Sequence, residues 1–144
     1  MKVVFAFLFL FSAFAYADST PVVDPVRGNW TIESRICSSG APVRDAFWIG
    51  RDELTLSLFD GKYETHTRIN GCHYWATGFY NVQGSMLRVY GVTGASNCTH
   101  QPPAREGTVM FNSVDGKLKI YTGPFGPGGS CPARDLLEAT FRAL

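Results

Sequence analysis

The side chains best suited to chemistry are the histidines His66, His73 and His100 and the carboxylates near them. Glu64 and His66 share one face of an expected strand, and His73 follows across an Asn-Gly pair that favours a hairpin turn. Two imidazoles and one carboxylate form a set that can bind a metal ion. The spacing is not specific for a metal, however, and such side chains usually form a solvated face. We therefore predict no metal site and no cofactor.

Other residue sets with catalytic potential lack the context that catalysis needs. Asp52 and Glu53 form an acidic pair at the start of an expected strand, where a solvated terminus is the simpler interpretation. Ser38, Ser39 and Ser96 lie near glycines but without the strand-to-helix turn that activates a serine nucleophile. No nucleophile with a base and no pair of catalytic carboxylates emerges, so the sequence predicts a protein that is not an enzyme.

Four cysteines, Cys37, Cys72, Cys98 and Cys131, stand far apart without any CxxC spacing. Zinc ligands and thioredoxin-like redox pairs usually have closer spacing. An even number of widely spaced cysteines favours two disulfides in an oxidising compartment. Spacing alone leaves three pairings open.

The first 17 residues have the features of a secretory signal peptide. Met1-Lys2 begins the chain, an apolar run interrupted only by Ser12 follows to Phe14, and Ala15-Tyr16-Ala17 supplies small residues at a cleavage site. The run is shorter than the about 20 residues needed to span a bilayer, although a retained anchor is the alternative. We expect a secreted protein, extracellular or periplasmic if bacterial, without a membrane span.

The remaining chain has the composition of one globular domain. Residues 18–27 contain Pro21 and Pro25 and predict a flexible leader, and residues 28–144 form the expected domain. Hydrophobic residues make up 45% of the chain, which excludes intrinsic disorder. Without Lys2 the balance is 12 basic against 12 acidic residues, and this argues against a nucleic-acid partner.

Apolar and polar residues alternate with the period of β-strands along this domain. Trp30, Ile32 and Ile36 illustrate the pattern in the first segment. A short helix over 135–144 is an alternative to a last strand there. The expected strands span residues 30–36, 54–58, 63–69, 72–82, 86–93, 108–113, 118–122 and 136–144.

The connections between these strands alternate in length. Tight turns at Asp60-Gly61, Gln83-Gly84 and Asp115-Gly116 fall at one end of the sheet. Three long connections, 38–52, 94–107 and 123–134, fall at the other end. This regular alternation predicts an all-β fold, an eight-stranded antiparallel up-and-down barrel with one closed end and one open end.

This topology resolves the cysteine pairing. All four cysteines fall at the open end of the predicted barrel. Cys72 and Cys98 belong to neighbouring strands of one hairpin. If the barrel closes, the first and last strands are neighbours, and Cys37 lies beside Cys131. We therefore predict the disulfides Cys37–Cys131 and Cys72–Cys98.

The inward face of an eight-stranded barrel is either a filled core or a site for one small ligand. The apolar residues expected there suit a small hydrophobic or amphipathic ligand, and a core of ordinary density is the alternative. The orientation of the 72–82 strand stays open, because His73, Trp75 and Phe79 compete with Tyr74 and Tyr80 for the inner face. The candidate ligand-binding residues are Trp30, Ile36, Leu54, Leu56, Tyr63, Trp75, Tyr80, Val89, Phe111 and Ile120.

Gly28-Asn29-Trp30 resembles the Gly-x-Trp signature of the lipocalin (calycin) superfamily, and Arg142 supplies an arginine on the last strand. In lipocalins such an arginine packs across the tryptophan. This sequence departs from that pattern, because strand alternation that places Phe141 inside the barrel places Arg142 outside. A weaker similarity, in Gly71-Cys72 and Gly78-Phe79-Tyr80, is to bacterial META-type domains. The lipocalin resemblance implies ligand carriage or protein binding.

Two functions follow from these features. The first is a secreted lipocalin-like protein that binds a small hydrophobic or amphipathic ligand. The alternative is a module that binds a protein partner or inhibits an enzyme through the disulfide-pinned loops at the open end. Aromatic and arginine side chains on such loops are typical of interface hot spots. The residues expected in that role are Phe47, Trp48, Arg105 and Phe125.

Overall fold

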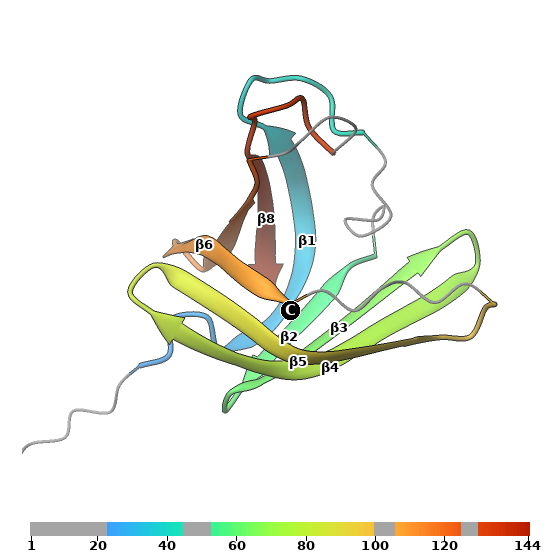
Figure 1. The fold of residues 1–144 in the computed structure, drawn as a ribbon. Coiled ribbons are helices and arrows are strands. Elements are labelled where there is room, and N and C mark those ends of the chain that lie inside the picture. Colours follow the sequence, from blue (N-terminus) through green and yellow to red (C-terminus); the bar gives the residue numbers. More distant parts are fainter. Residues whose placement is uncertain (1–22, 45–52, 100–105, 125–129) are drawn as a thin grey trace, which may run out of the picture.

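Eight β-strands account for all regular secondary structure in the described part of the computed structural model (Figure 1). The structure describes residues 23–44, 53–99, 106–124 and 130–144. The last segment, for which a short helix was the alternative, is a strand. The strands are β1 (Gly28–Cys37), β2 (Thr55–Phe59), β3 (Lys62–Ile69), β4 (Cys72–Gln83), β5 (Met86–Ser96), β6 (Gly107–Val114), β7 (Lys117–Thr122) and β8 (Leu137–Ala143).

Each strand pairs with its neighbours in the sequence, and β1 pairs with β8, so that the sheet forms a closed antiparallel barrel. The predicted up-and-down topology is therefore confirmed. Closure leaves no strand of this sheet without a partner on either side. Within the described ranges, no helix has the length and apolar character needed to cross a bilayer.

Three tight turns have the backbone geometry that the sequence predicted. Asp60, Asn70 and Asp115 adopt φ values of 50°, 50° and 55°, and the glycine after each is also at positive φ. Two consecutive residues of positive φ characterise the type I′ turn, whose twist matches that of the flanking strands. These sequences therefore fix the register of three hairpins.

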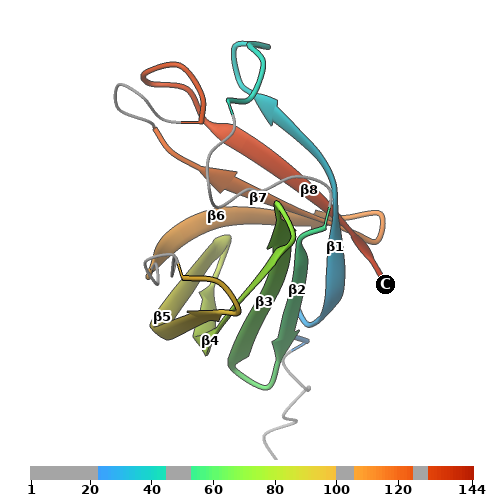
Figure 2. The same ribbon diagram turned by 90° about the vertical axis from the view of Figure 1, so that its right-hand side faces the viewer.

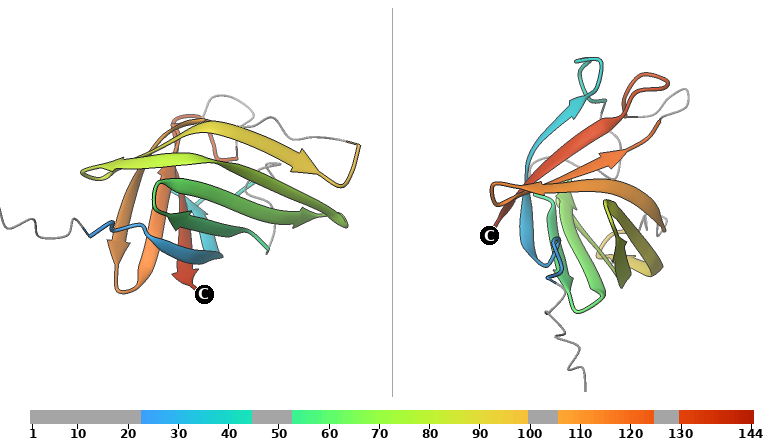
Figure 3. Two further views of the ribbon diagram at one scale, coloured as in Figure 1. Left: turned by 90° about the horizontal axis from the view of Figure 1, so that it is seen from below. Right: turned by 90° about the vertical axis from the view of Figure 1, so that its left-hand side faces the viewer.

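The strands β2 to β5 form one group, and β6 to β8 with β1 form the other. These two groups are paired along only part of their length. β1 pairs with β2 over Gly28–Thr31 alone, and β5 pairs with β6 over Met86–Val89 alone, although β5 continues to Ser96. Beyond these points β1 and β8 diverge from β4 and β5 (Figures 1 and 2). Seen from below, β4 and β5 run across β7 and β8 (Figure 3). The barrel consequently has a closed end, at the Asp60-Gly61 turn, and an open end.

Each diverging part is held by one disulfide, as predicted. Cys37, the last residue of β1, is bonded to Cys131 with a Cα–Cα distance of 5.7 Å. Cys72, the first residue of β4, is bonded to Cys98 with a Cα–Cα distance of 5.8 Å. We call these parts the β1–β8 lip, ending at Cys37, and the β4–β5 lip, ending at Cys72. All four cysteines are paired, which is consistent with an oxidising compartment.

The closed end contains the main core. Trp30, Leu58 and Leu118 are buried there, and the indole Nε1 of Trp30 donates a hydrogen bond of 2.9 Å to the carbonyl oxygen of Val26. Val26 itself is 0% exposed. The expectation of a flexible leader is thus wrong for its last residues, because Val26 fills the bottom of the barrel and cannot leave without exposing apolar surface.

A β-bulge in β1 corrects a second expectation. Ile32 pairs with Phe141, but Ser34 pairs with Thr140, so Glu33 is one extra residue in the strand. The bulge reverses the alternation beyond it. Ile36 therefore points outward and is 55% exposed, whereas the alternation of β1 alone had placed it inside.

A second bulge bends β5 toward the open end. Thr77 pairs with Thr93 and Phe79 with Tyr90, and Gly91 between them has a φ of 61°. Gly78 lies opposite, where an added Cβ would come within 2.9 Å of the carbonyl oxygen of Tyr90. Glycine is needed at both positions, for the left-handed conformation at one and the close backbone approach at the other.

Candidate ligand-binding cavity

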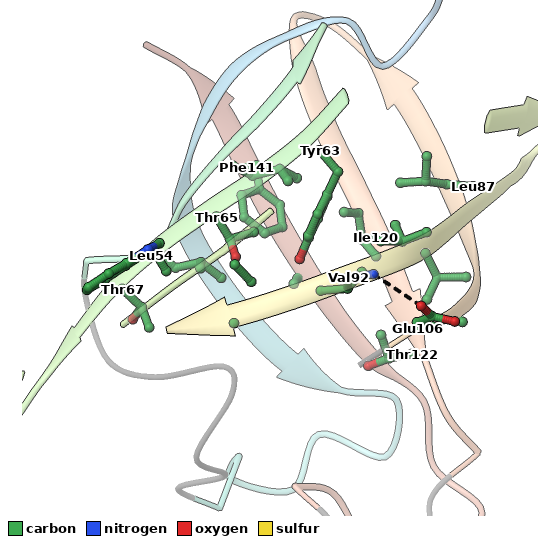
Figure 4. A pocket seen from close by; sticks show the side chains of 18 of the residues that line it. Leu54, Tyr63, Thr65, Thr67, Leu87, Val92, Glu106, Ile120, Thr122 and Phe141 are labelled. Atoms are coloured by element: carbon green, nitrogen blue, oxygen red, sulfur yellow. Dashed lines mark hydrogen bonds between the residues drawn. The ribbon is translucent and has the colours of Figure 1, made fainter. Parts of the chain in front are cut away.

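A cavity of about 350 Å³ lies inside the barrel between the two lips (Figure 4). Residues from β3 to β8 line it, together with Leu56 in β2 and Leu54 just before that strand. Its volume lies within the range of pockets that hold small molecules. The barrel is therefore neither a filled core throughout nor a wide channel.

Six of the ten predicted ligand-binding residues line this cavity, and the other four do not. Trp30, Tyr80 and Phe111 are buried in the closed-end core, below the cavity. Ile36 lies on the outer face for the reason given above. The six that line the cavity are Leu54, Leu56, Tyr63, Trp75, Val89 and Ile120.

The structure resolves the orientation of β4, which the sequence left open. Tyr74 and Tyr80 are buried, whereas Phe79 is 50% exposed. Trp75 borders the cavity, but its indole packs against the His73 ring on the outer face at a centroid distance of 5.2 Å. The inner face of β4 is thus formed by the alternating residues that include Tyr74 and Tyr80.

The part of the cavity nearest the closed end is apolar. Leu56, Leu87 and Phe141 belong both to the cavity wall and to the buried core. Tyr63 lies beside them, and its burial raises the pKa of its phenol, an effect partly offset by a side-chain hydrogen bond with Thr65. Tyr63 is therefore neutral at physiological pH and contributes a ring and a hydroxyl group to the wall.

The structure also brings polar residues into the wall that the candidate list omitted. Thr67 in β3 and Thr122 in β7 each bury a hydroxyl oxygen for which the described protein offers no hydrogen-bond partner. Glu106, just before β6, accepts a hydrogen bond of 3.1 Å from the backbone N–H of Val92. The alternation of Tyr63, Thr65 and Thr67 was a signal for Thr67; nothing comparable pointed to Glu106.

The His66 cluster lies on the outer face of the barrel, away from this cavity. His66 Nε2 is 2.6 Å from Glu64 Oε1, and His66 Nδ1 is 3.1 Å from His73 Nε2. The three groups thus form a chain with His66 in the middle, and Glu64 and His73 meet opposite nitrogens of its ring. Among the described residues, no three His, Cys, Asp or Glu side chains converge as a metal ion would require.

The residues expected to bind a protein partner, Phe47, Trp48, Arg105 and Phe125, all lie outside the described ranges. The structure therefore assigns them no position relative to the cavity. Binding of a protein partner through the open-end loops stays a prediction from the sequence.

Comparisons of the chain with family models, with curated proteins and with solved structures found no match. The resemblance to lipocalins consequently stays a prediction carried by Gly28-Asn29-Trp30. Any function must be argued from the barrel and its cavity.

Proposed function

We propose that the protein binds a small hydrophobic or amphipathic ligand in the cavity between the two lips. The observation that carries this proposal is the cavity itself, about 350 Å³ of space with walls that are mainly apolar. Water in such a space forms few hydrogen bonds with the wall, so an apolar group that displaces it gains free energy. No covalent chemistry is needed for this role.

We further propose that the protein is exported and acts as a lipocalin-like carrier. The apolar run that precedes Ala17 supports cleavage and export. Two disulfides fit an oxidising environment outside the cytosol. Carriage, rather than catalysis, is also what the resemblance at Gly28-Asn29-Trp30 implies.

The experiment that tests ligand binding compares one large side chain on the two faces of β4. Ala76→Phe places a ring in the cavity, because Ala76 lines it. Thr77→Phe places the same ring on the next residue, which is exposed. We expect an environment-sensitive apolar dye to bind to the wild type and to T77F, and to lose most of its affinity for A76F.

Native mass spectrometry of protein purified from its source provides the second measurement. A co-purifying small molecule that is absent from A76F and present on T77F would support the proposal. The proposal would be overturned if the folded wild type bound no apolar dye, or if A76F bound the dye as tightly as T77F. Circular dichroism of both variants verifies that each is folded.

A further inference from the structure

The wall of the cavity is not uniform along the barrel. Leu56, Leu87 and Phe141 form its deep part, next to the closed-end core. Thr67, close to the end of β3, and Thr122, the last residue of β7, lie toward the open end. Figure 4 shows Thr122 and Glu106 on one side of the cavity and Thr67 on the opposite side. An occupant that matches this wall has an apolar part placed deep and a polar part placed near the mouth.

The two threonine hydroxyls indicate hydrogen bonding to the occupant. Their oxygen atoms are buried and have no partner within the described protein. A buried hydroxyl without a partner destabilises the fold, so buried polar groups are normally satisfied by protein, water or ligand. Since both oxygens belong to residues of the cavity wall, a polar group inside the cavity can satisfy them.

Glu106, an exposed residue at the mouth of the cavity, gives this polar region its charge. One oxygen of its carboxylate accepts the Val92 N–H across the gap where β5 and β6 are no longer paired. A carboxylate has about four acceptor positions, so this bond leaves capacity for a donor on the occupant. Among the lining residues that the structure describes, Glu106 is the only one with a formal charge.

Two arginines bear on this charge, and neither belongs to the cavity wall. Arg88 lines a separate groove together with Glu106. Arg35 pairs with Ala139 and so points to the same side of the sheet as that lining residue. Arg35 is not part of the cavity wall and has an interaction of its own. The wall therefore presents one carboxylate and several hydroxyl groups, which attract a donor-rich cation and repel an anion.

We infer that the ligand is an amphiphile whose polar head is a protonated amine, held by Glu106 and by the orphan hydroxyl of Thr122. This inference rests on the proposed function and specifies the chemical class of its ligand. An ammonium group supplies three N–H donors, matching the acceptors present. If each heavy atom takes about the volume of a water molecule, roughly 30 Å³, a ligand that fills the cavity has about ten to twelve heavy atoms, its head group included.

The test uses three probes with the same ten-carbon chain and different heads: decylamine, decanol and decanoate. Displacement of an apolar dye at pH 7 and low salt gives their affinities. We expect decylamine to bind at least tenfold more tightly than decanoate, with decanol between them. High salt should reduce the preference for the amine and leave decanol unchanged.

Glu106→Gln isolates the charge, because the glutamine oxygen can still accept the Val92 N–H. We expect decylamine to lose about five- to tenfold in affinity while decanol is unchanged. Glu64→Gln is the matched control, since it removes an equal charge from the outer face and should alter neither affinity. Thr122→Val should weaken both the amine and the alcohol.

The outcomes separate this inference from the proposed function. Equal or tighter binding of decanoate than of decylamine overturns the inference and leaves cavity binding intact. The same conclusion follows if E106Q leaves the ratio of decylamine to decanol affinity unchanged. Failure of all three probes and of the dye to bind folded wild-type protein overturns the proposed function, and the inference with it.

Discussion

The closed and open ends of the barrel are stabilised in different ways. At the closed end, Trp30, Leu58 and Tyr80 pack into one core, and all eight strands are joined by backbone hydrogen bonds. Toward the open end, two of the eight strand pairings are interrupted, and a disulfide holds each lip. One end thus relies on burial and the other on covalent bonds.

This difference explains how the protein can contain a cavity. Close packing contributes most of the folding free energy, and a cavity with unpartnered hydroxyls reduces it. Because the core lies below the cavity, close packing stabilises one end of the barrel while the other end keeps space for a ligand. The disulfides then reduce the entropy of the unfolded chain without filling the space that a ligand would use.

Removal of the disulfides should show how much the open end depends on them. By the chain-entropy estimate, the 94-residue separation of Cys37 and Cys131 corresponds to at most about 4.7 kcal/mol, and the 26-residue separation of Cys72 and Cys98 to about 3.5 kcal/mol. We expect the free energy of unfolding, measured by denaturant titration, to fall more in C37S/C131S than in C72S/C98S. The reverse order would contradict this account.

Truncation of Trp30 should show how much the closed end depends on burial. Trp30→Ala removes a core ring and its hydrogen bond to Val26, so we expect a loss of about 3 to 5 kcal/mol in the free energy of unfolding. Ile36→Ala, on the exposed side of the same strand, is the control and should cost less than about 1 kcal/mol. Similar losses in both variants would mean that Trp30 is not a core residue.

The closed end should also weaken at alkaline pH through Tyr80. Burial raises the pKa of its phenol, and its hydrogen bond to Asp24 and the charge of that carboxylate act in the same direction. Above pH 10 the unfolded chain loses this proton before the folded chain does, so the free energy of unfolding falls by up to about 1.4 kcal/mol per pH unit. Below pH 10 the contribution is complete.

Tyr80→Phe supplies the comparison for this pH effect. The variant lacks the ionisable phenol, so its unfolding free energy should fall less steeply than that of the wild type above pH 10. Denaturant titrations at pH 8 to 11.5 measure both slopes. Parallel slopes would show that Tyr80 ionises equally in both states.

The smallest expected effect has the opposite sign. Thr67→Val replaces an orphan hydroxyl in the cavity wall by a methyl group of similar size, and we expect it to stabilise the unliganded protein by about 1 kcal/mol. Thr108→Val, at an exposed position of β6, is the control and should change little. Destabilisation by T67V, measured by thermal unfolding, would mean that the hydroxyl has a partner.

Much of this architecture could be predicted because it is encoded locally. Period-2 alternation located the strands to within a few residues, as for the 54–58 segment that forms Thr55–Phe59. Pairs such as Asp60-Gly61 fixed the turns, and the turns fixed the order of the strands. Once the order was known, Cys37 had Cys131 as its neighbour, so the pairing followed from topology.

The candidate site was harder to predict because it depends on features that no local pattern encodes. One bulge residue, Glu33, reversed the orientation of Ile36. Trp30 is inward as expected, and Tyr80, whose orientation was left open, is inward as well. Both lie below the cavity, and alternation carries no information about depth. Glu106 precedes the strand expected at 108–113, so periodicity did not indicate its role. The divergence of the lips, which creates the cavity, is a property of the whole sheet.

The backbone N–H of Leu144 donates a hydrogen bond of 3.0 Å to the carbonyl oxygen of Asn29, so the last residue lies beside the beginning of the first strand. Both residues belong to the end of the barrel that carries the core. A label or tether attached at Leu144 would therefore leave the barrel at the end opposite the ligand entrance. The same arrangement allows immobilisation through Leu144 with the entrance facing the solution.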